Sequence, residues 1–495
     1  MTKIKQLAVA AAAVLCAPSV SAQSAAEAIF DEMVAFYGTM GMSVEVGDRS
    51  VAGETFTASD LVFAYGSLGV STELSVETLE VAPSDIADYA FELRFTDDAI
   101  AVVTTEMPEG VAPLVTEMQI EQPGNVTLVG GTPDERTFAY TADALRFIFD
   151  DAPVAGPDGV LFDMILALNA VEGTAAVDEN DTLKYETKAN EMTVEYSFSA
   201  EGEGLSLSTV YKDVAFSGAG PIDGLVDIAT LVASNAMSEG VFTMASSETR
   251  IQIDDFAGSS LIRATSGPGR LEASIGDGHL DYSFLSADND ITVDSASMPV
   301  PSANLTADKM AFRFALPVAP TNTPGEMIVD LELEGIAISE EIWGMFDPTG
   351  GLPRTDAALV LRVRSTATAR VNFTDPEAMQ NDPAAMAMPF DFDDVAIEEL
   401  RLTVAGVELE ASGAAQLVDA GPIPMPVGGI DLKLAGALGL IEKLQEIGLV
   451  PPEQAQAAPM MLGMFALPGD APDTFTSRIE MTEDGQLTAN GIPLQ

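Results

Sequence analysis

The stretch Tyr89-Ala90-Phe91-Glu92-Leu93-Arg94-Phe95 alternates between large apolar side chains and small or charged ones. A second stretch, Met192-Thr193-Val194-Glu195-Tyr196-Ser197-Phe198, repeats this pattern further along the chain. Because successive side chains of a β-strand point to opposite faces, the alternation predicts strands with one apolar face and one face in water. Joined by Gly, Asp, Asn and Ser turns, such strands are expected to form an antiparallel meander.

The same alternation recurs through most of the chain and sets the expected fold class. We predict a mainly β protein whose large, twisted and curved antiparallel sheet is elongated or groove-forming, with several short helices packed on it. Apolar residues at helical spacing predict an opening helix over Ala25–Met40. Further helices are expected at Val160–Val171, Ile222–Ser238, Ser339–Met345, Leu432–Leu449 and Glu453–Phe465.

Four short segments share a spacing in which an Ala is followed by large apolar residues three, five and seven positions later. They begin at Ala58, Ala142, Ala189 and Ala307. One interpretation is a turn residue that starts a strand with three apolar side chains on one face. Chance alternation explains the segments about as well, because their separations are too irregular for a solenoid. The segment at Ala142 is also compatible with a helix.

The chain is expected to divide into a signal peptide and two β-rich regions. We place the signal at residues 1–22, an N-terminal region with the opening helix at 23–320, and a C-terminal region at 321–495. The C-terminal region contains a helical segment over 432–466. A Pro-rich stretch at 317–324 suggests this boundary, and one continuous elongated sheet is the alternative.

The first residues have the pattern of a secretory signal. Lys3 and Lys5 form a positive region, Leu7–Ala17 a short apolar region, and Val20-Ser21-Ala22 a cleavage site, which places the cut before Gln23. The apolar run is shorter than a membrane-spanning helix requires. We therefore expect an exported, periplasmic protein without a transmembrane segment in the mature chain.

Composition excludes several classes of function. The chain has 77 acidic and 22 basic residues, a formal net charge of −55, and 47% hydrophobic residues. So few cations argue against nucleic-acid binding, while the apolar content is sufficient for a folded core. With one Cys and one His (His279), a Cys/His zinc module and a Cys–His protease are excluded. His279 is expected at a solvated turn, and no cofactor is predicted.

Two interpretations of the acidity stay open. Carboxylate clusters at Asp178-Glu179-Asn180-Asp181, Asp288-Asn289-Asp290 and Asp391-Phe392-Asp393-Asp394 could hold a hard cation. None of them continues as an EF-hand loop, which needs alternating acids, a central Gly and a distal Glu. We favour a solvated acidic surface and predict no metal site.

Two stretches near the C-terminus carry a resemblance. The first runs from Trp343 through Asp347-Pro348 to Leu352-Pro353-Arg354, and the second holds Asp484-Gly485 and Asn490-Gly491. With the export signal and the acidity, they make the chain similar to the bacterial secreted family DUF2125. A weaker likeness links the closing motif to AsmA-like and YdgA-like envelope proteins. The family implies no catalytic residue that could be transferred.

The residues of these stretches are interpreted first as scaffold: Trp343, Asp347, Pro348, Pro353, Asp484, Gly485, Asn490 and Gly491. The Trp343 ring is expected to anchor a short helix to a sheet, and a ligand-stacking platform is the alternative. The Asp-Pro pair suits a turn, Asp484-Gly485 a two-residue hairpin and Asn490-Gly491 a second turn.

Two classes of function remain. The preferred class is a non-catalytic envelope protein that presents an apolar sheet face to lipid or to an envelope partner. The alternative is a carboxylate-dependent hydrolase acting on envelope polysaccharide. The Met-rich segment Pro459–Phe465 supports the first class if it lies on the surface. For that segment alone, however, the favoured interpretation is that its methionines belong to the core.

The signal assignment makes a direct prediction. Because the small residues before Gln23 suit signal peptidase, N-terminal sequencing of the protein from the periplasmic fraction should begin at Gln23. A chain that retains Met1, or one that begins with a lipid-modified Cys16, would contradict the prediction.

Overall fold

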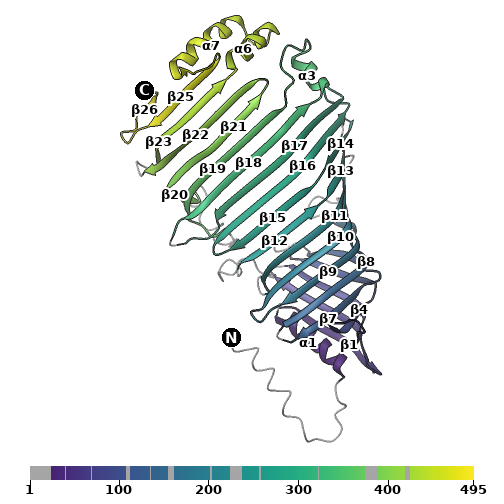
Figure 1. Cartoon of the computed structure of the whole chain (residues 1–495). Coiled ribbons are helices and arrows are strands. Elements are labelled where there is room, and N and C mark those ends of the chain that lie inside the picture. Colours follow the sequence, from purple (N-terminus) through teal and green to yellow (C-terminus); the bar gives the residue numbers. More distant parts are fainter. Residues whose placement is uncertain are drawn as a thin grey trace.

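The computed structural model describes most of the chain beyond the predicted signal peptide. It covers residues 24–39, 41–67, 70–106, 112–133, 135–153, 161–200, 203–222, 237–255, 258–321, 323–373, 388–418 and 424–494. Residues 1–22 and most of the helix expected at Ile222–Ser238 lie outside this description. Within it, 27 strands form one sheet in which the paired strands are antiparallel (Figure 1).

The helices are α1 (Ala25–Thr39), α3 (Glu340–Phe346), α6 (Ala437–Glu446) and α7 (Pro452–Phe465). The strands are β1 Ser43–Ala52, β2 Thr55–Ser67, β3 Val70–Pro83, β4 Tyr89–Phe95, β5 Asp98–Thr105, β6 Leu114–Glu121, β7 Val126–Thr132, β8 Glu135–Pro153, β9 Leu161–Val177, β10 Thr182–Ala200, β11 Glu203–Pro221, β12 Ser238–Met244, β13 Ser246–Asp255, β14 Gly258–Ser266, β15 Gly269–Gly276, β16 His279–Ser295, β17 Ser302–Pro317, β18 Gly325–Ile338, β19 Ala357–Ala369, β20 Phe390–Phe392, β21 Asp394–Val404, β22 Val407–Val418, β23 Met425–Ala435, β24 Leu467–Pro468, β25 Thr474–Met481, β26 Leu487–Ala489 and β27 Ile492–Pro493. The predicted fold class, a β-rich sheet with a few short helices, is confirmed.

The sheet repeats one pattern of connections. After the long strand β3, β4 pairs with its C-terminal half and β5 with its N-terminal half; β6 then pairs with β5, and β7 with β4. The next long strand, β8, pairs with both β7 and β6. Strands β11 to β16 follow the same order. A third copy begins where β19 pairs with β20 and β21.

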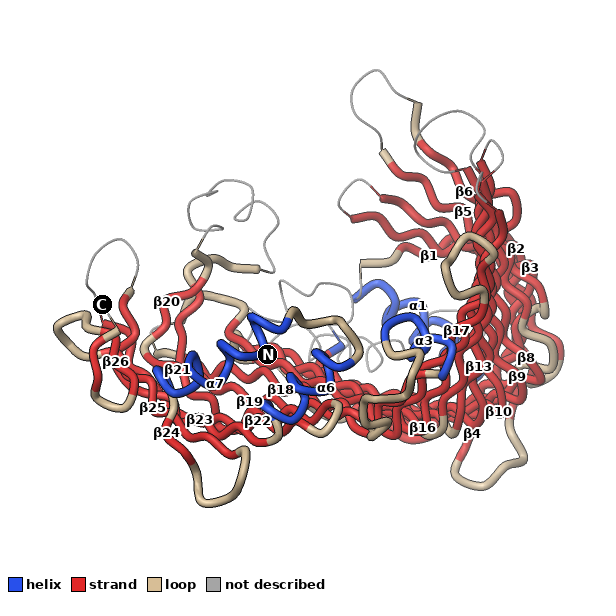
Figure 2. Tube along the Cα trace, turned by 90° about the horizontal axis from the view of Figure 1, so that it is seen from above, coloured by secondary structure: helices blue, strands red, loops and turns tan. Residues whose placement is uncertain are grey.

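The sheet is strongly curved (Figure 2), and α3, α6 and α7 lie at the upper edge of the sheet in Figure 1. Helix α1 packs on the inner face of the first strands, where Phe30 meets Phe56 with their ring centres 5.0 Å apart. Around this contact lies a cluster of buried residues that includes Leu61, Leu79 and Val81. The helix therefore covers the N-terminal end of the sheet.

A line of residues that take no part in the strand ladders crosses the long strands at mid-length. We call this set the bulge line: Gly47, Asp60, Asp143, Ala170, Asn190, Asp213, Asp288, Asp308 and Gly335. Five of them, including Asp60, Ala170 and Gly335, have a positive φ. Such residues bend a strand and shift its pleat by one position. The junctions between the short strands continue the line, and at one of them the buried Asn125 amide donates hydrogen bonds to the carbonyl oxygens of Phe95 and Gln122.

The bulge line gives the four Ala segments a physical meaning. Ala58, Ala142, Ala189 and Ala307 are all buried, and each lies one or two residues before a member of the line. At the line, each strand leaves one residue unpaired. The Ala before the line and the apolar residues after it are therefore an odd number of positions apart, yet they point to the same face. The interpretation as turns that start strands is wrong, since the segments lie inside β2, β8, β10 and β17. The Ala142 segment is likewise strand, not helix.

The helix predictions have mixed outcomes. Those for Ala25–Met40, Ser339–Met345 and Glu453–Phe465 are confirmed by α1, α3 and α7. The helix expected at Val160–Val171 is wrong, because residues 161–171 belong to β9, whose continuous apolar run hides its period of two, and Val160 lies outside the described residues. The helical segment expected from Leu432 begins only at Ala437, because residues 432–435 complete β23.

The division at residues 320 and 321 stays a proposal. Strands β17 and β18, which precede and follow it, are paired from Leu305–Ile338 to Ala315–Ile328. In the described part of the chain, no helix has both the length and the apolar character needed to cross a membrane.

The bulge line predicts the effect of a small substitution. Gly335 has a φ of 64°, and a Cβ atom there would lie 2.2 Å from an Asp308 carboxylate oxygen. Gly335→Ala should therefore lower the free energy of unfolding by about 1–3 kcal/mol, measured by thermal melting. Gly344→Ala in α3 is the control, because its Cβ would meet nothing within 4 Å. Equal melting temperatures for the two variants would contradict the structural role of the line.

Candidate functional site

The candidate site is the inner face of the sheet, built from residues that pair directly across strands. One row runs over eleven strands from β11 to β25. Its members are Phe216, Phe242, Leu271, Phe284, Phe312, Leu331, Leu361, Leu400, Ala411, Leu432 and Ser477. Directly paired residues point to the same face, so ten apolar side chains form a continuous stripe that ends at Ser477.

A second row lies on the other side of the bulge line. It crosses eight strands through Phe149, Met164, Tyr196, Leu207, Ile251, Ile262, Val293 and Ala303. Phe216 and Phe242 of the first row pack in one cluster with Leu145 and Met192, which precede the second row on β8 and β10. Both rows therefore belong to one face, and contacts through Phe138 connect that face to the cluster under α1.

Most of this face is only partly covered by the described residues. Phe284 is 36% exposed, Phe312 37% and Val329 39%, whereas Phe56 under α1 is 0% exposed. The two clusters of buried residues found in the described ranges both lie before residue 245. The C-terminal half of the inner face thus presents large aromatic and aliphatic side chains that no second layer of described residues buries.

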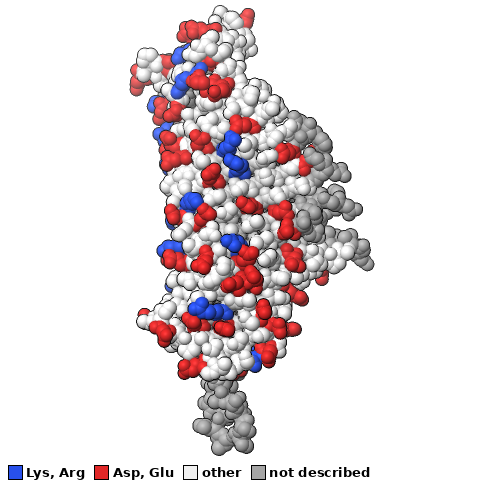
Figure 3. All heavy atoms as spheres, turned by 90° about the vertical axis from the view of Figure 1, so that its right-hand side faces the viewer, with Lys and Arg blue, Asp and Glu red and all other residues white. Residues whose placement is uncertain are grey.

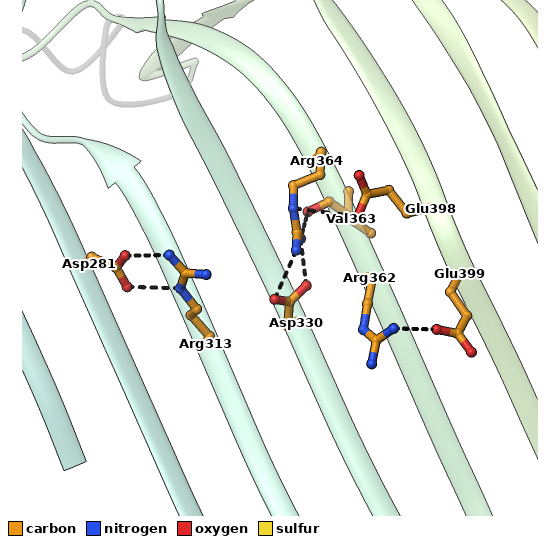
Figure 4. A network of polar contacts seen from close by, with 8 residues as sticks. All are labelled: Asp281, Arg313, Asp330, Arg362, Val363, Arg364, Glu398 and Glu399. Carbon is orange, nitrogen blue, oxygen red and sulfur yellow. Dashed lines mark hydrogen bonds and ion pairs between the residues drawn. The ribbon is translucent and has the colours of Figure 1, made fainter.

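The opposite, outer face carries the charges. Arg313 donates two hydrogen bonds to Asp281 on the neighbouring strand, at 3.1 and 2.7 Å. Arg364 pairs in the same way with Asp330, and Arg362 with Glu399 at 2.6 Å (Figure 4). Acidic and basic side chains are interspersed over the side of the molecule seen in Figure 3. The outer face is therefore a set of cross-strand ion pairs in water.

These ion pairs shift the pKa values of their members in the direction that favours the charged forms. The hydrogen bond from Lys309 is the main cause that lowers the pKa of Glu332. The hydrogen bond to Asp281 is the main cause that raises the pKa of Arg313. Each exposed ion pair of this kind contributes little to the free energy of unfolding. Together the pairs distribute the few basic residues among the many acidic ones.

The first motif folds around the Asp347 carboxylate. It accepts backbone N–H bonds from Gly351 at 2.9 Å and from Leu352 at 2.8 Å, and an Arg354 bond at 2.6 Å. The Arg354 guanidinium lies 4.3 Å from the centre of the Trp343 ring, which also contacts Phe346. The motif thus closes on itself after α3, with Pro348 and Pro353 inside the loop.

The pKa of Asp347 reflects two opposed effects. Burial of the side chain would raise it, but the bonds from Leu352, Arg354 and Gly351 prevail and lower the pKa from 3.8 to about 2. The carboxylate therefore stays charged and fully hydrogen-bonded at neutral pH. The assignment of Trp343, Asp347, Pro348 and Pro353 to the scaffold stays a prediction.

The second motif lies in the closing strands. Asn490 and Gly491 both have a positive φ and form the two-residue turn between β26 and β27. Asp484 and Gly485 lie instead in the longer loop of residues 482–486 between β25 and β26, so a two-residue hairpin there is wrong. Figure 1 places this motif beside α7 and the first motif beside α3, so the two do not form one site.

The other predicted polar features have local roles. His279 is the first residue of β16, directly after a turn at Asp277-Gly278. Asp178 accepts backbone hydrogen bonds from Asn180 and Thr182, chiefly the former, which lowers its pKa. Among the described residues, no group of three or more His, Cys, Asp or Glu is arranged to hold a metal ion.

The interpretation of the Met-rich segment as core is wrong. In α7 the exposed fractions are 74% for Met460, 59% for Met461 and 64% for Met464. The helix has no buried residue.

Two features were missed from the sequence. One is the role of Arg354, for which the spacing from Trp343 and from Asp347 is the available signal. The paired aromatic residues Phe284 and Phe312 lie 28 positions apart, so only the register of β16 and β17 reveals them.

The motif predicts a pH-dependent effect. Asp347→Asn should lower stability at pH 7, because the charged acceptor of the hydrogen bonds from Gly351, Leu352 and Arg354 is lost. A carboxyl whose folded pKa is depressed stabilises the fold above its unfolded pKa, near 3.8, and loses that effect as the pH falls through about 2. The difference from wild type should therefore narrow between these values. Urea unfolding followed by Trp343 fluorescence measures it; a difference independent of pH would contradict the account.

Comparison with known proteins gives one match. A family model described as "Uncharacterized protein conserved in bacteria (DUF2125)" matches residues 251–495. No curated protein and no solved structure matches the chain, and the likeness to AsmA-like and YdgA-like proteins stays a prediction. Through its residues 251–495, which run from β13 to the C-terminus, the chain therefore belongs to the DUF2125 family.

Proposed function

We propose that this protein is an exported, periplasmic, non-catalytic protein that binds lipid acyl chains along its inner face. The observation that carries the proposal is the continuous row of apolar residues over the strands from β11 to β25, partly exposed opposite an ion-paired outer face. Large exposed apolar surfaces on soluble folds usually mark binding sites. Here the surface is a stripe, which suits an elongated ligand.

The dimensions of the stripe favour lipid. Neighbouring strands lie about 4.8 Å apart, so eleven strands span roughly 48 Å. One acyl chain reaches across half of a bilayer core, roughly 15 Å. The stripe is therefore long enough for several acyl chains placed end to end. Its aromatic and aliphatic side chains offer contact area without charged groups, as hydrocarbon requires.

Export supports the same proposal. The signal pattern of residues 1–22 would deliver the chain to the envelope, where phospholipid is abundant. An apolar segment of an envelope protein is the other candidate occupant. A flexible acyl chain suits the stripe better, because the first row has no charged side chain that would fix the register of a peptide.

The alternative, a carboxylate-dependent hydrolase, has less support. A glycosidase acid needs a carboxyl group whose pKa is raised. In Asp347, Glu332 and Asp178, hydrogen bonds outweigh the effect of burial, and the pKa of each carboxyl group is lowered. No observation favours this function over lipid binding.

A pair of variants on one strand tests the proposal. Phe284 and Leu285 are neighbours on β16 with 36% and 37% exposure, but they point to the inner and the outer face. Phe284→Glu should weaken the binding of a phospholipid with a fluorescent acyl chain by roughly tenfold, because a carboxylate enters the apolar stripe. Leu285→Glu should leave binding unchanged.

Circular dichroism checks that both variants remain folded. The proposal fails if the wild-type protein does not bind the labelled phospholipid. It also fails if the two folded variants lose binding equally, because the inner face would then have no special role.

A further inference from the structure

The exposed apolar surface of α7 and of the residues after it is distinct from the stripe. Met460, Met461, Met464, Phe465 and Leu467 are between 44% and 74% exposed. The segment 454–469 has no charged residue, in a chain of which 20% of residues are charged. A surface this apolar and this free of charge is unusual on so acidic a protein.

The C-terminal end of α7 is fixed to the end of the first inner-face row. The Phe465 carbonyl oxygen accepts hydrogen bonds from the Ser477 hydroxyl at 2.5 Å and from the Asn490 amide at 3.0 Å. Ser477 is the last member of that row and pairs with Leu432. The Asp473 carboxylate holds the preceding helix by accepting the N–H groups of Leu438 and Gly439. The exposed surface is thus held rigidly where the stripe ends.

From this placement we propose that α7 is a membrane-contact element. Its exposed Met, Phe and Leu side chains enter the interfacial layer of a lipid bilayer, so that acyl chains pass between the bilayer and the inner face. Flexible Met side chains adapt to the irregular surface of lipid. The transfer of acyl chains in this inference rests on the proposed function. The contact of α7 with the bilayer rests only on its exposed apolar surface.

Charge selects the occupant. A second copy of this chain would bring a further net charge of −55 against the first, and self-repulsion opposes that contact. Interfacial helices that select anionic lipid carry Lys and Arg on their polar face, and α7 has neither. The bilayer surface that fits is therefore zwitterionic, and added anionic lipid should weaken binding.

Flotation with vesicles tests the inference. The purified protein should float with phosphatidylcholine vesicles, and less with vesicles containing phosphatidylglycerol. Met461→Glu/Met464→Glu should reduce flotation by roughly tenfold, because two carboxylates would enter the apolar layer. Gln454→Glu/Gln456→Glu is the matched control, with the same added charge on exposed positions of the same helix. It should float like wild type.

The outcomes separate this inference from the proposed function. Loss of flotation with unchanged binding of the dispersed fluorescent phospholipid supports a role of α7 in membrane contact alone. No flotation by the wild-type protein, or equal loss in both variants, overturns the inference. A concentration-dependent dimer that Met461→Glu/Met464→Glu dissociates, without flotation, would assign the surface to a second copy and overturn it too.

Discussion

The structure depends on keeping the pleats of successive strands in phase, so that apolar side chains stay on one face. In a ladder, a slip of one residue would turn every side chain of a strand to the wrong face. The bulge line keeps the strands in phase at mid-length, because the strands that carry it each leave one residue unpaired at the same level. Asp308 and Gly335, and likewise Gly47 and Asp60, face each other there, and the small Gly leaves room for the Asp side chain.

The separation of faces also accounts for the unusual composition. The outer face is in water and accommodates many of the acidic residues, with the few basic ones distributed as partners, as in Arg313–Asp281 and Lys433–Glu410. The inner face uses the apolar residues in one layer, where a globular protein would bury them between two. Such a sheet leaves part of its apolar surface half-exposed, and that is the basis of the proposed lipid binding.

The repeated order of connections relates the two halves of the chain. The matched family region starts at residue 251, inside the second copy of the pattern, whereas β3 to β8 form the first copy outside it. Both copies contribute to one inner face and share the bulge line. The N-terminal copy differs because α1 covers it, while the C-terminal end carries the exposed helix α7. The two ends of the inner face are therefore chemically different.

The sequence by itself determined the β-rich class, the single apolar face and the places of three helices, because strict alternation and helical spacing are local signals. The wrong predictions lie where local signals are ambiguous. The apolar run of β9 has no visible period of two, and the composition of the Met-rich segment is that of a buried helix. Only the tertiary structure decided that Phe284 meets Phe312, that Arg354 stacks on Trp343, and that Met460 faces solvent. These facts depend on the pairing of distant segments, which no local pattern encodes.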